Sequence, residues 1–367
     1  MSILCAIMYR NEGKTMIYTV TLNPTLDYFV DVPDFKMGHV SRTESEILIP
    51  GGKGINVSVV LKNLGVDNTA IYYSAGFVGK EITRRIAELG INTEEVVVKE
   101  GISRINVKIV QLDGTEINGI GPTITEEDLD VLMKKVQELK EDDILVLGGS
   151  IPDSVPDTIY RDIMASIDGK GIHVVVDATK DLLTNVLEYH PFLIKPNNYE
   201  LGDIFDVQLT SREAVIPYAF KLQEMGARNV LVSLAGEGAV LVTEMGDVYE
   251  CEAPKGNLVS SVGAGDSMVA GFIYGYTTKR SYNYALDMGV SAGSASAFSD
   301  YLATRDQIMD VYNSLNIGLG AESNVEEEKT TATNVSLGIS TDAEPEVLLG
   351  ADANVPDTDD DGGLPLD

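Results

Sequence analysis

The chain has 367 residues, 44% hydrophobic and 23% charged, which is typical of a folded globular protein. Acidic residues outnumber basic ones by 57 to 27, and the net charge of −30 argues against a general nucleic-acid binder. With two cysteines, the chain has neither a disulfide framework nor a zinc site made of cysteine clusters, and a reducing cytoplasm is the simplest location.

The N-terminal segment contains an apolar run from Ile3 to Met8, without a basic segment before it or a cleavage site after it, so it does not resemble a secretory signal. The first strand-like run starts at Met16. We therefore predict that residues 1–15 are an N-terminal extension and that translation naturally starts at Met16. No stretch has the roughly 18 consecutive apolar residues of a membrane helix, so no membrane partner is expected.

The region from Met16 to Leu315 alternates short Val/Ile-rich runs with helical patterns, as in parallel sheets with crossover helices. The runs cover 69–75, 143–150, 173–178 and 229–234, and helical patterns follow at 78–90 and near 156. A helix is predicted over 125–140, because Thr125 and Asp128 form a capping pattern ahead of an apolar stripe. The predicted fold class is α/β, a single doubly wound, mostly parallel sheet.

Two stretches depart from this alternation. Residues 40–49 and 105–117 alternate apolar and polar side chains with no helix following, which is typical of antiparallel strands. We expect them to stand apart from the main sheet as a small β lid or as a clasp between two chains, that is, a homodimer.

The C-terminal segment 316–367 has 13 acidic residues against one lysine and no aromatic residue. Such a composition predicts a disordered acidic tail. The domain organisation expected is thus an extension at 1–15, one folded domain at 16–315 and a tail at 316–367.

A glycine-rich segment near the C-terminal end of the domain carries the strongest functional signal. Gly263, Ala264 and Gly265 lead directly into a helical pattern, where backbone N–H groups at a helix N-terminus attract phosphate. Asp266 stands beside this anion site and is suited to accept a proton from a hydroxyl that attacks a phosphoryl group. For these four residues alone, a glycine-rich turn with a capping aspartate is the alternative.

Two further motifs have both a functional and a structural interpretation. PGGKGINVS (50–58) places Lys53 and Asn56 beside glycines that let a substrate approach the main chain, although such turns are also common scaffolding. In LIKPNNYE (193–200), Asn197 and Glu200 lie three residues apart, as needed to hold hydrated magnesium or simply to form a capping box. The chain lacks a Walker A box, and it lacks the GxGxxG of a dinucleotide-binding dehydrogenase after its first strand.

Together these motifs resemble the PfkB (ribokinase-like) family of carbohydrate kinases over about residues 16–315. The resemblance implies a ribokinase-like sheet with a lid, and ATP-dependent phosphorylation of a sugar hydroxyl with Mg²⁺. It also implies that Asp266 is the catalytic base and that the amides of Gly263, Ala264, Gly265 and Asp266 form the anion hole. A non-catalytic sensor of sugar phosphates would use the same pocket without turnover.

The resemblance also implies roles for individual positions. The substrate-binding positions are Asp27, Arg42, Gly52, Lys53, Asn56, Arg104 and Ser150. The nucleotide-binding positions are Lys195, Asn197, Ser233, Gly236, Gly238, Gly263 and Gly265, and the metal positions are Asn197 and Glu200.

The segments 20–27, 103–109, 116–122 and 147–152 most resemble members that act on the C6 hydroxyl of fructose 1-phosphate, followed by those acting on tagatose 6-phosphate. Fructose 6-phosphate stays open as a third substrate. Ser260 and Ser261 stand where many members have Asp-Thr, so dependence on a monovalent cation is not implied.

Overall fold

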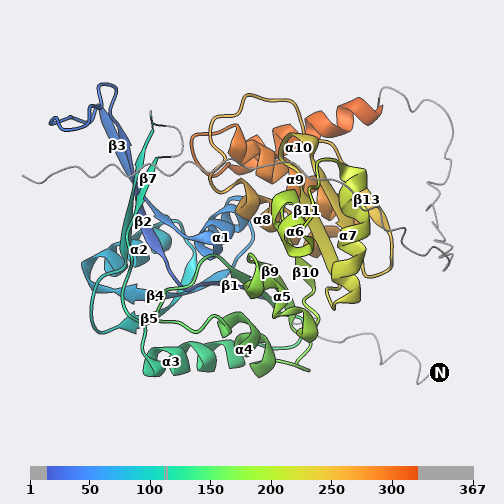
Figure 1. The fold of residues 1–367 in the computed structure, drawn as a ribbon, viewed down its shortest axis with the longest axis horizontal. Helices are drawn as coiled ribbons and strands as arrows, with labels where there is room; N and C mark the ends of the chain where they lie inside the picture. Colours follow the sequence, from blue (N-terminus) through green and yellow to red (C-terminus); the bar gives the residue numbers. More distant parts are fainter. Residues whose placement is uncertain (1–14, 111, 113–114, 321–367) are drawn as a thin grey trace, which may run out of the picture. The chain divides into compact units, whose positions relative to one another are not determined.

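Nine strands form the larger of two sheets in the computed structural model, which describes residues 15–110, 112 and 115–320 (Figure 1). Across the sheet they are β13 (Val248–Cys251), β12 (Ala239–Val242), β11 (Asn229–Ser233), β10 (Leu193–Ile194), β9 (His173–Asp177), β8 (Ile144–Gly148), β1 (Ile17–Thr21), β4 (Thr69–Ala75) and β5 (Asn92–Val98). All pairs from β5 to β11 are parallel, and only β12 and β13 join antiparallel. The predicted doubly wound, mostly parallel sheet is confirmed.

Helices cover both faces of this sheet. One face packs against α3 (Glu126–Gln137), α4 (Ile159–Ser166), α5 (Asp181–Thr184), α6 (Asn198–Phe205) and α7 (Arg212–Glu224). The other face packs against α1 (Lys53–Asn63), α2 (Gly76–Glu88), α8 (Ala264–Lys279), α9 (Tyr282–Ala297) and α10 (Arg305–Gly320). Two short 3₁₀ turns, η2 (Leu187–Tyr189) and η3 (Ala235–Glu237), lie in the connections. The predicted capping box of Thr125 and Asp128 starts α3.

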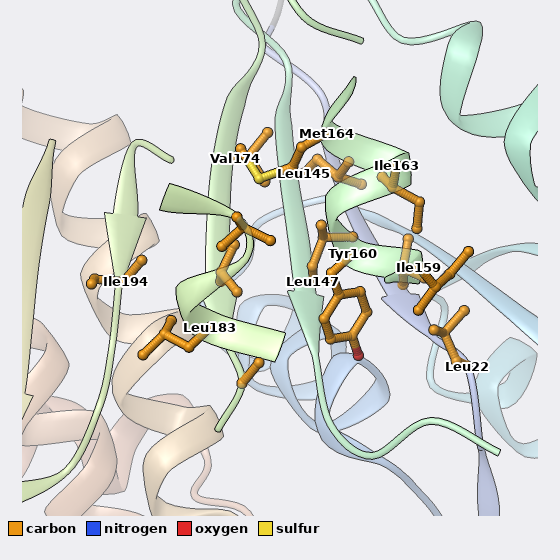
Figure 2. Close-up of a cluster of buried hydrophobic side chains, with 14 of the residues drawn as sticks. Leu22, Leu145, Leu147, Ile159, Tyr160, Ile163, Met164, Val174, Leu183 and Ile194 are labelled. Atoms are coloured by element: carbon orange, nitrogen blue, oxygen red, sulfur yellow. The ribbon is translucent and has the colours of Figure 1, made fainter. Parts of the chain in front are cut away.

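Strand β8 shows why the central strands are continuously apolar. Leu145 and Leu147 enter the core under α4, whereas Ile144 and Val146 enter the core on the opposite face. A strand covered on both faces needs apolar residues at every position, because successive side chains point to opposite sides. Figure 2 shows Tyr160 of α4 beside Leu147. The hydroxyl of Tyr160 donates to the carbonyl of Gly149 at 3.0 Å, which anchors the loop after β8 to the core.

A second sheet of four strands is ordered β3 (Ser45–Gly51), β2 (Thr25–Asp31), β6 (Arg104–Ile109) and β7 (Glu116–Asn118) (Figure 1). The expectation of a small separate sheet is confirmed. Its strands differ from the expected ones, since β3 begins only at Ser45 and β2 was not predicted. Strand β2 pairs in parallel with β6, not antiparallel. Local alternation does not encode this pairing, which joins residues about 80 positions apart.

The predicted domain boundary at Leu315 falls within α10, which continues to Gly320. The extension at 1–14 and the tail from 321 lie outside the described residues. None of the described helices combines the length and the apolar character that crossing a membrane demands.

Candidate active site

A cavity of about 320 Å³ lies where the carboxyl ends of β1 and β8 meet the small sheet. It is lined by five segments remote in the sequence, listed as Thr21, Asn23, Thr25, Asp27, Gly52, Lys53, Asn56, Arg104, Asn106, Lys108, Gly148, Gly149, Ser150, Val262, Gly263 and Asp266. The carboxyl edge of a parallel sheet is the usual position of ligand sites in α/β folds.

The turn before α8 contributes the positive end of a helix to this cavity. Gly263 caps α8 in a left-handed conformation with φ of +76°, and a Cβ there would lie 2.6 Å from Cδ2 of Leu302. Only glycine meets both requirements. The first N–H groups of a helix have no acceptor within the helix, and the helix dipole adds partial positive charge there. The turn is therefore suited to bind an anion.

Asp266, in the first turn of α8, is buried, and Asn56 Nδ2 donates to its Oδ2 at 2.8 Å. Burial, reinforced by the nearby carboxylate of Asp177, raises the pKa of Asp266 to about 6. Lys53, Asn56 and Lys195 act in the opposite direction. A carboxylate with this pKa is mostly ionised at neutral pH and is a better proton acceptor than an exposed aspartate, as suits a general base.

A buried ion-pair cluster lies next to Asp266. Lys53 Nζ is 3.1 Å from Oδ2 of Asp177, and Lys195 Nζ is 3.2 Å from Oδ1 of the same carboxylate. Although burial opposes ionisation, Lys195 and Lys53 hold the pKa of Asp177 below its ordinary value. Asp177 was not among the predicted site residues, although a charged residue at the end of a strand, within the apolar run 173–178, was an available signal.

The small sheet forms the other wall of the cavity. Thr25 is paired with Arg104, and Asp27 with Asn106, in the register of β2 and β6. Asp27 is buried, its Oδ1 accepts a hydrogen bond from Thr25 Oγ1 at 3.1 Å, and its Oδ2 lies 3.6 Å from Lys108 Nζ. Burial raises the pKa of Asp27, and Lys108 opposes the rise.

Lys108 and Asn106 were likewise not among the predicted site residues. Arg104, Asn106 and Lys108 alternate along β6, so they share one face of the strand, the face that lines the cavity. Lys108 Nζ is additionally 3.3 Å from Glu116 of β7. Alternation in RINVK was the available signal, but it does not by itself show which face is the inner one.

Arg104 is the cavity cation best placed for an anionic ligand. Its Nε donates to the carbonyl of Asn23 at 3.1 Å, and no carboxylate of the described residues lies within 4 Å of its guanidinium. Burial lowers the pKa of Arg104, although the group stays charged at any ordinary pH. A planar guanidinium can bind a phosphate through two parallel hydrogen bonds.

Among the other predicted substrate positions, the structure brings Gly52, Lys53, Asn56 and Ser150 to the cavity. It does not bring Arg42 there, because that side chain is exposed on the segment that precedes β3.

The predicted metal pair forms a capping box at the start of α6. The N–H of Glu200 donates to Asn197 Oδ1 and the N–H of Asn197 donates to Glu200 Oε2, both at 2.8 Å. The structural alternative for this pair is thus realised. The cap uses one carboxylate oxygen, so Oε1 of Glu200 remains for a water-mediated contact to a hard cation.

The remaining nucleotide positions lie beyond β10, at the next strands of the sheet. Ser233 ends β11 and is bridged to Asn197, and its N–H donates to the carbonyl of Pro196 at 3.2 Å. Gly236 lies in η3 with open space around it, and Gly238 has φ of +91° and no room for a Cβ, which would lie 2.0 Å from the carbonyl of Cys251. Lys195 Nζ would contact a Cβ at Gly265, so it lies against the turn of α8.

Comparisons with known proteins agree with this geometry. The model of the pfkB family of carbohydrate kinases matches residues 20–306. The chain is 46% identical over 296 residues to 1-phosphofructokinase of Bacillus subtilis, covering 81% of this chain and 97% of the relative. It is 36% identical over 285 residues to D-tagatose-1-phosphate kinase of Bacillus licheniformis, covering 77% and 93%. The structure of phosphofructokinase-2 from Escherichia coli with fructose-6-phosphate superposes with a TM-score of 0.76 at 28% identity, covering 82% and 99%.

Proposed function

The chain belongs to the pfkB family of carbohydrate kinases, and from that premise we propose that it transfers the γ-phosphoryl group of ATP to the C6 hydroxyl of fructose 1-phosphate. The observation that carries the proposal is the position of Asp266, a buried carboxylate at the N-terminus of α8 that lines the same cavity as Arg104. The proposal thus assigns a proton acceptor, an anion-binding turn and a phosphate-binding cation to one cavity.

In the proposed mechanism, Asp266 accepts the proton of the C6 hydroxyl as its oxygen attacks the γ-phosphorus. Asn56 occupies Oδ2 of this carboxylate, which leaves Oδ1 to receive the proton. The amides of Gly263, Gly265 and Asp266 stabilise the charge that develops on the transferred group, and the amide of Ala264 joins them once it leaves the carbonyl of Ser261, to which it donates at 3.3 Å. A preorganised donor of this kind typically contributes about 3 to 4 kcal/mol to transition-state stabilisation.

The sugar phosphate is held by both walls of the cavity. Asp27 accepts hydrogen bonds from sugar hydroxyls, because it is buried on the wall of the cavity with its Oδ2 3.6 Å from Lys108 Nζ. Arg104 binds the existing phosphate through its guanidinium. Gly52 also lines the cavity, and with φ of +111° and a Cβ that would lie 2.6 Å from Thr21 Cγ2 it admits no side chain there.

The nucleotide lies along the carboxyl edge of β10 and β11, with Lys195 directed at its phosphates and Ser233, Gly236 and Gly238 forming the loop beside it. Glu200 fits Mg²⁺ through Oε1 and water, since hard oxygen donors and retained waters are what this ion prefers. When bound, Mg²⁺ neutralises part of the phosphate charge. The cap keeps Glu200 in one orientation for this task.

The choice of sugar rests on the relatives. The relatives from Bacillus subtilis and Bacillus licheniformis are named for the 1-phosphates of two ketoses, fructose and tagatose, which differ in configuration at C4. The relative with the higher identity acts on fructose 1-phosphate by its name, and so that sugar is preferred here over the 6-phosphates of tagatose and fructose.

A homodimer formed through the small sheet is proposed as the assembly. Strands β3 and β7 are the two edges of this sheet, and they expose Ile47 and Ile117, with Ile120 just beyond. Exposed strand edges with apolar side chains favour pairing with another chain. Sedimentation of Ile117→Lys tests it, since the charge should dissociate a dimer formed there.

An assay of ADP release with MgATP tests the proposed reaction. The panel contains fructose 1-phosphate, tagatose 1-phosphate, tagatose 6-phosphate, fructose 6-phosphate and free fructose. We expect the highest kcat/KM with fructose 1-phosphate. Binding of a sugar phosphate without ADP release would instead identify a sensor.

A further inference from the structure

Asp177 joins the sugar cavity to the nucleotide side of the site, and no step of the proposed mechanism uses it. It is the last residue of β9, is 3% exposed, and pairs one carboxylate oxygen with Lys53 and the other with Lys195. Lys53 begins α1 and lines the sugar cavity, whereas Lys195 follows β10 and lies against Gly265. One carboxylate therefore ties together two lysines from opposite sides of the site.

This cluster is unusual for a purely structural element. Burying a carboxylate costs several kcal/mol unless it is paired with good geometry, and apolar packing is often as stable as a buried ion pair. The lysine side chains differ in burial, since Lys53 is 36% exposed and Lys195 is 5% exposed. The more exposed ammonium group faces the cavity in which a phosphoryl group is transferred.

The charges around Asp266 explain why the pairing of Asp177 with the two lysines matters for the proton acceptor. Asn56 of α1 donates to Asp266, Lys53 of α1 lines the same cavity, and Lys195 lies against the adjacent Gly265. Asp177 of β9 is paired with both of these lysines. Asp177 repels the ionised base, and both lysines attract it. If Asp177 were neutral, both ammonium groups would be released to act on Asp266, and an ion pair with a lysine would make that carboxylate a weaker proton acceptor.

We propose that Asp177 is a positioning residue that keeps Lys53 and Lys195 off the catalytic base and holds both ammonium groups toward the phosphoryl group in transfer. The inference rests on the proposed kinase function. It predicts that loss of the Asp177 carboxylate lowers the pKa of Asp266, because removal of that charge and release of the lysines both favour the ionised form of Asp266.

The test compares the pH dependence of kcat/KM for fructose 1-phosphate in Asp177→Asn and Asp177→Glu with the unmodified protein. Asp177→Asn removes the charge at constant shape, so the acidic limb should move to lower pH by about one unit and kcat should fall at least about tenfold. Asp177→Glu keeps the charge, so its acidic limb should stay near that of the unmodified protein.

Asp67→Asn is the matched control. It removes another aspartate that pairs with a lysine, Lys62 at 3.2 Å, near the far end of α1. Its pH profile and kcat should equal those of the unmodified protein.

An acidic limb that does not move in Asp177→Asn overturns the inference, and so does a change confined to the Mg²⁺ requirement. If Asp177→Asn does not fold, Lys195→Met takes its place. Loss of one attracting ammonium group should move the acidic limb of the kcat/KM profile to higher pH. An acidic limb that stays in place again overturns the inference. Absence of turnover by the unmodified protein with every sugar phosphate refutes the proposed function itself, and this inference with it.

Discussion

Replacement of Asp266 by asparagine should inactivate the protein and stabilise it at the same time. Asparagine has the same shape, and its side-chain oxygen can still accept the hydrogen bond that Asn56 donates at 2.8 Å. The substitution therefore removes the proton acceptor and the charge, with little change in packing. A general base contributes about 100-fold to 10,000-fold, so kcat should fall at least about 100-fold, while the KM for the sugar phosphate changes little.

The gain in stability follows from the pKa of this carboxylate. Burial and Asp177 raise it from the ordinary value of 3.8 to about 6, and each unit corresponds to 1.36 kcal/mol. Because the folded state binds this proton more tightly than the unfolded state, the ionised group costs about 3 kcal/mol of folding free energy at neutral pH. The cost is absent below about pH 4 and develops as the pH rises from about 4 to about 6.

Thermal unfolding at several pH values measures this effect directly. Asp266→Asn should have the higher Tm at pH 7.5, and its advantage should shrink as the pH falls toward 4. Turnover near that of the unmodified protein would refute the assignment of the base. A Tm at pH 7.5 equal to or below that of the unmodified protein would refute the argument that the carboxylate is held ionised against its burial.

Three other substitutions test separate parts of the site. Arg104→Ala should raise the KM for fructose 1-phosphate at least about tenfold, because it removes charge-assisted hydrogen bonds to the phosphate. Arg42 is exposed, so its replacement by alanine should leave the KM unchanged. Equal effects of the two substitutions would contradict the placement of the phosphate. Gly263→Ala places a Cβ 2.6 Å from Leu302 at φ of +76°, so both Tm and kcat should fall, and unchanged kinetics would exclude the turn from the anion site. Glu200→Gln preserves the capping box, so the protein should still fold. The Mg²⁺ concentration for half-maximal rate should rise about 10-fold or more. An unaltered Mg²⁺ requirement would remove Glu200 from the metal site.

Features that depend on neighbours in the sequence were predictable. The run 69–75 coincides with β4, and Thr125 caps α3 through Asp128 as its pattern indicated. The glycine-rich segment before Asp266 does start a helix, with Gly263 as its cap. Side-chain periodicity, capping and glycine at positive φ act over a few residues, so the local sequence contains the information.

Contacts between remote segments were decided by the tertiary structure alone. Asn56 meets Asp266 across 210 residues, and Asp177 receives one lysine from α1 and another from the end of β10. The inner face of β6 became known only from its parallel pairing with β2. Sheet order and register set these distances, and they result from the burial of all the strands and helices together. The motifs therefore indicated a sugar kinase, while packing determined which charges act on Asp266.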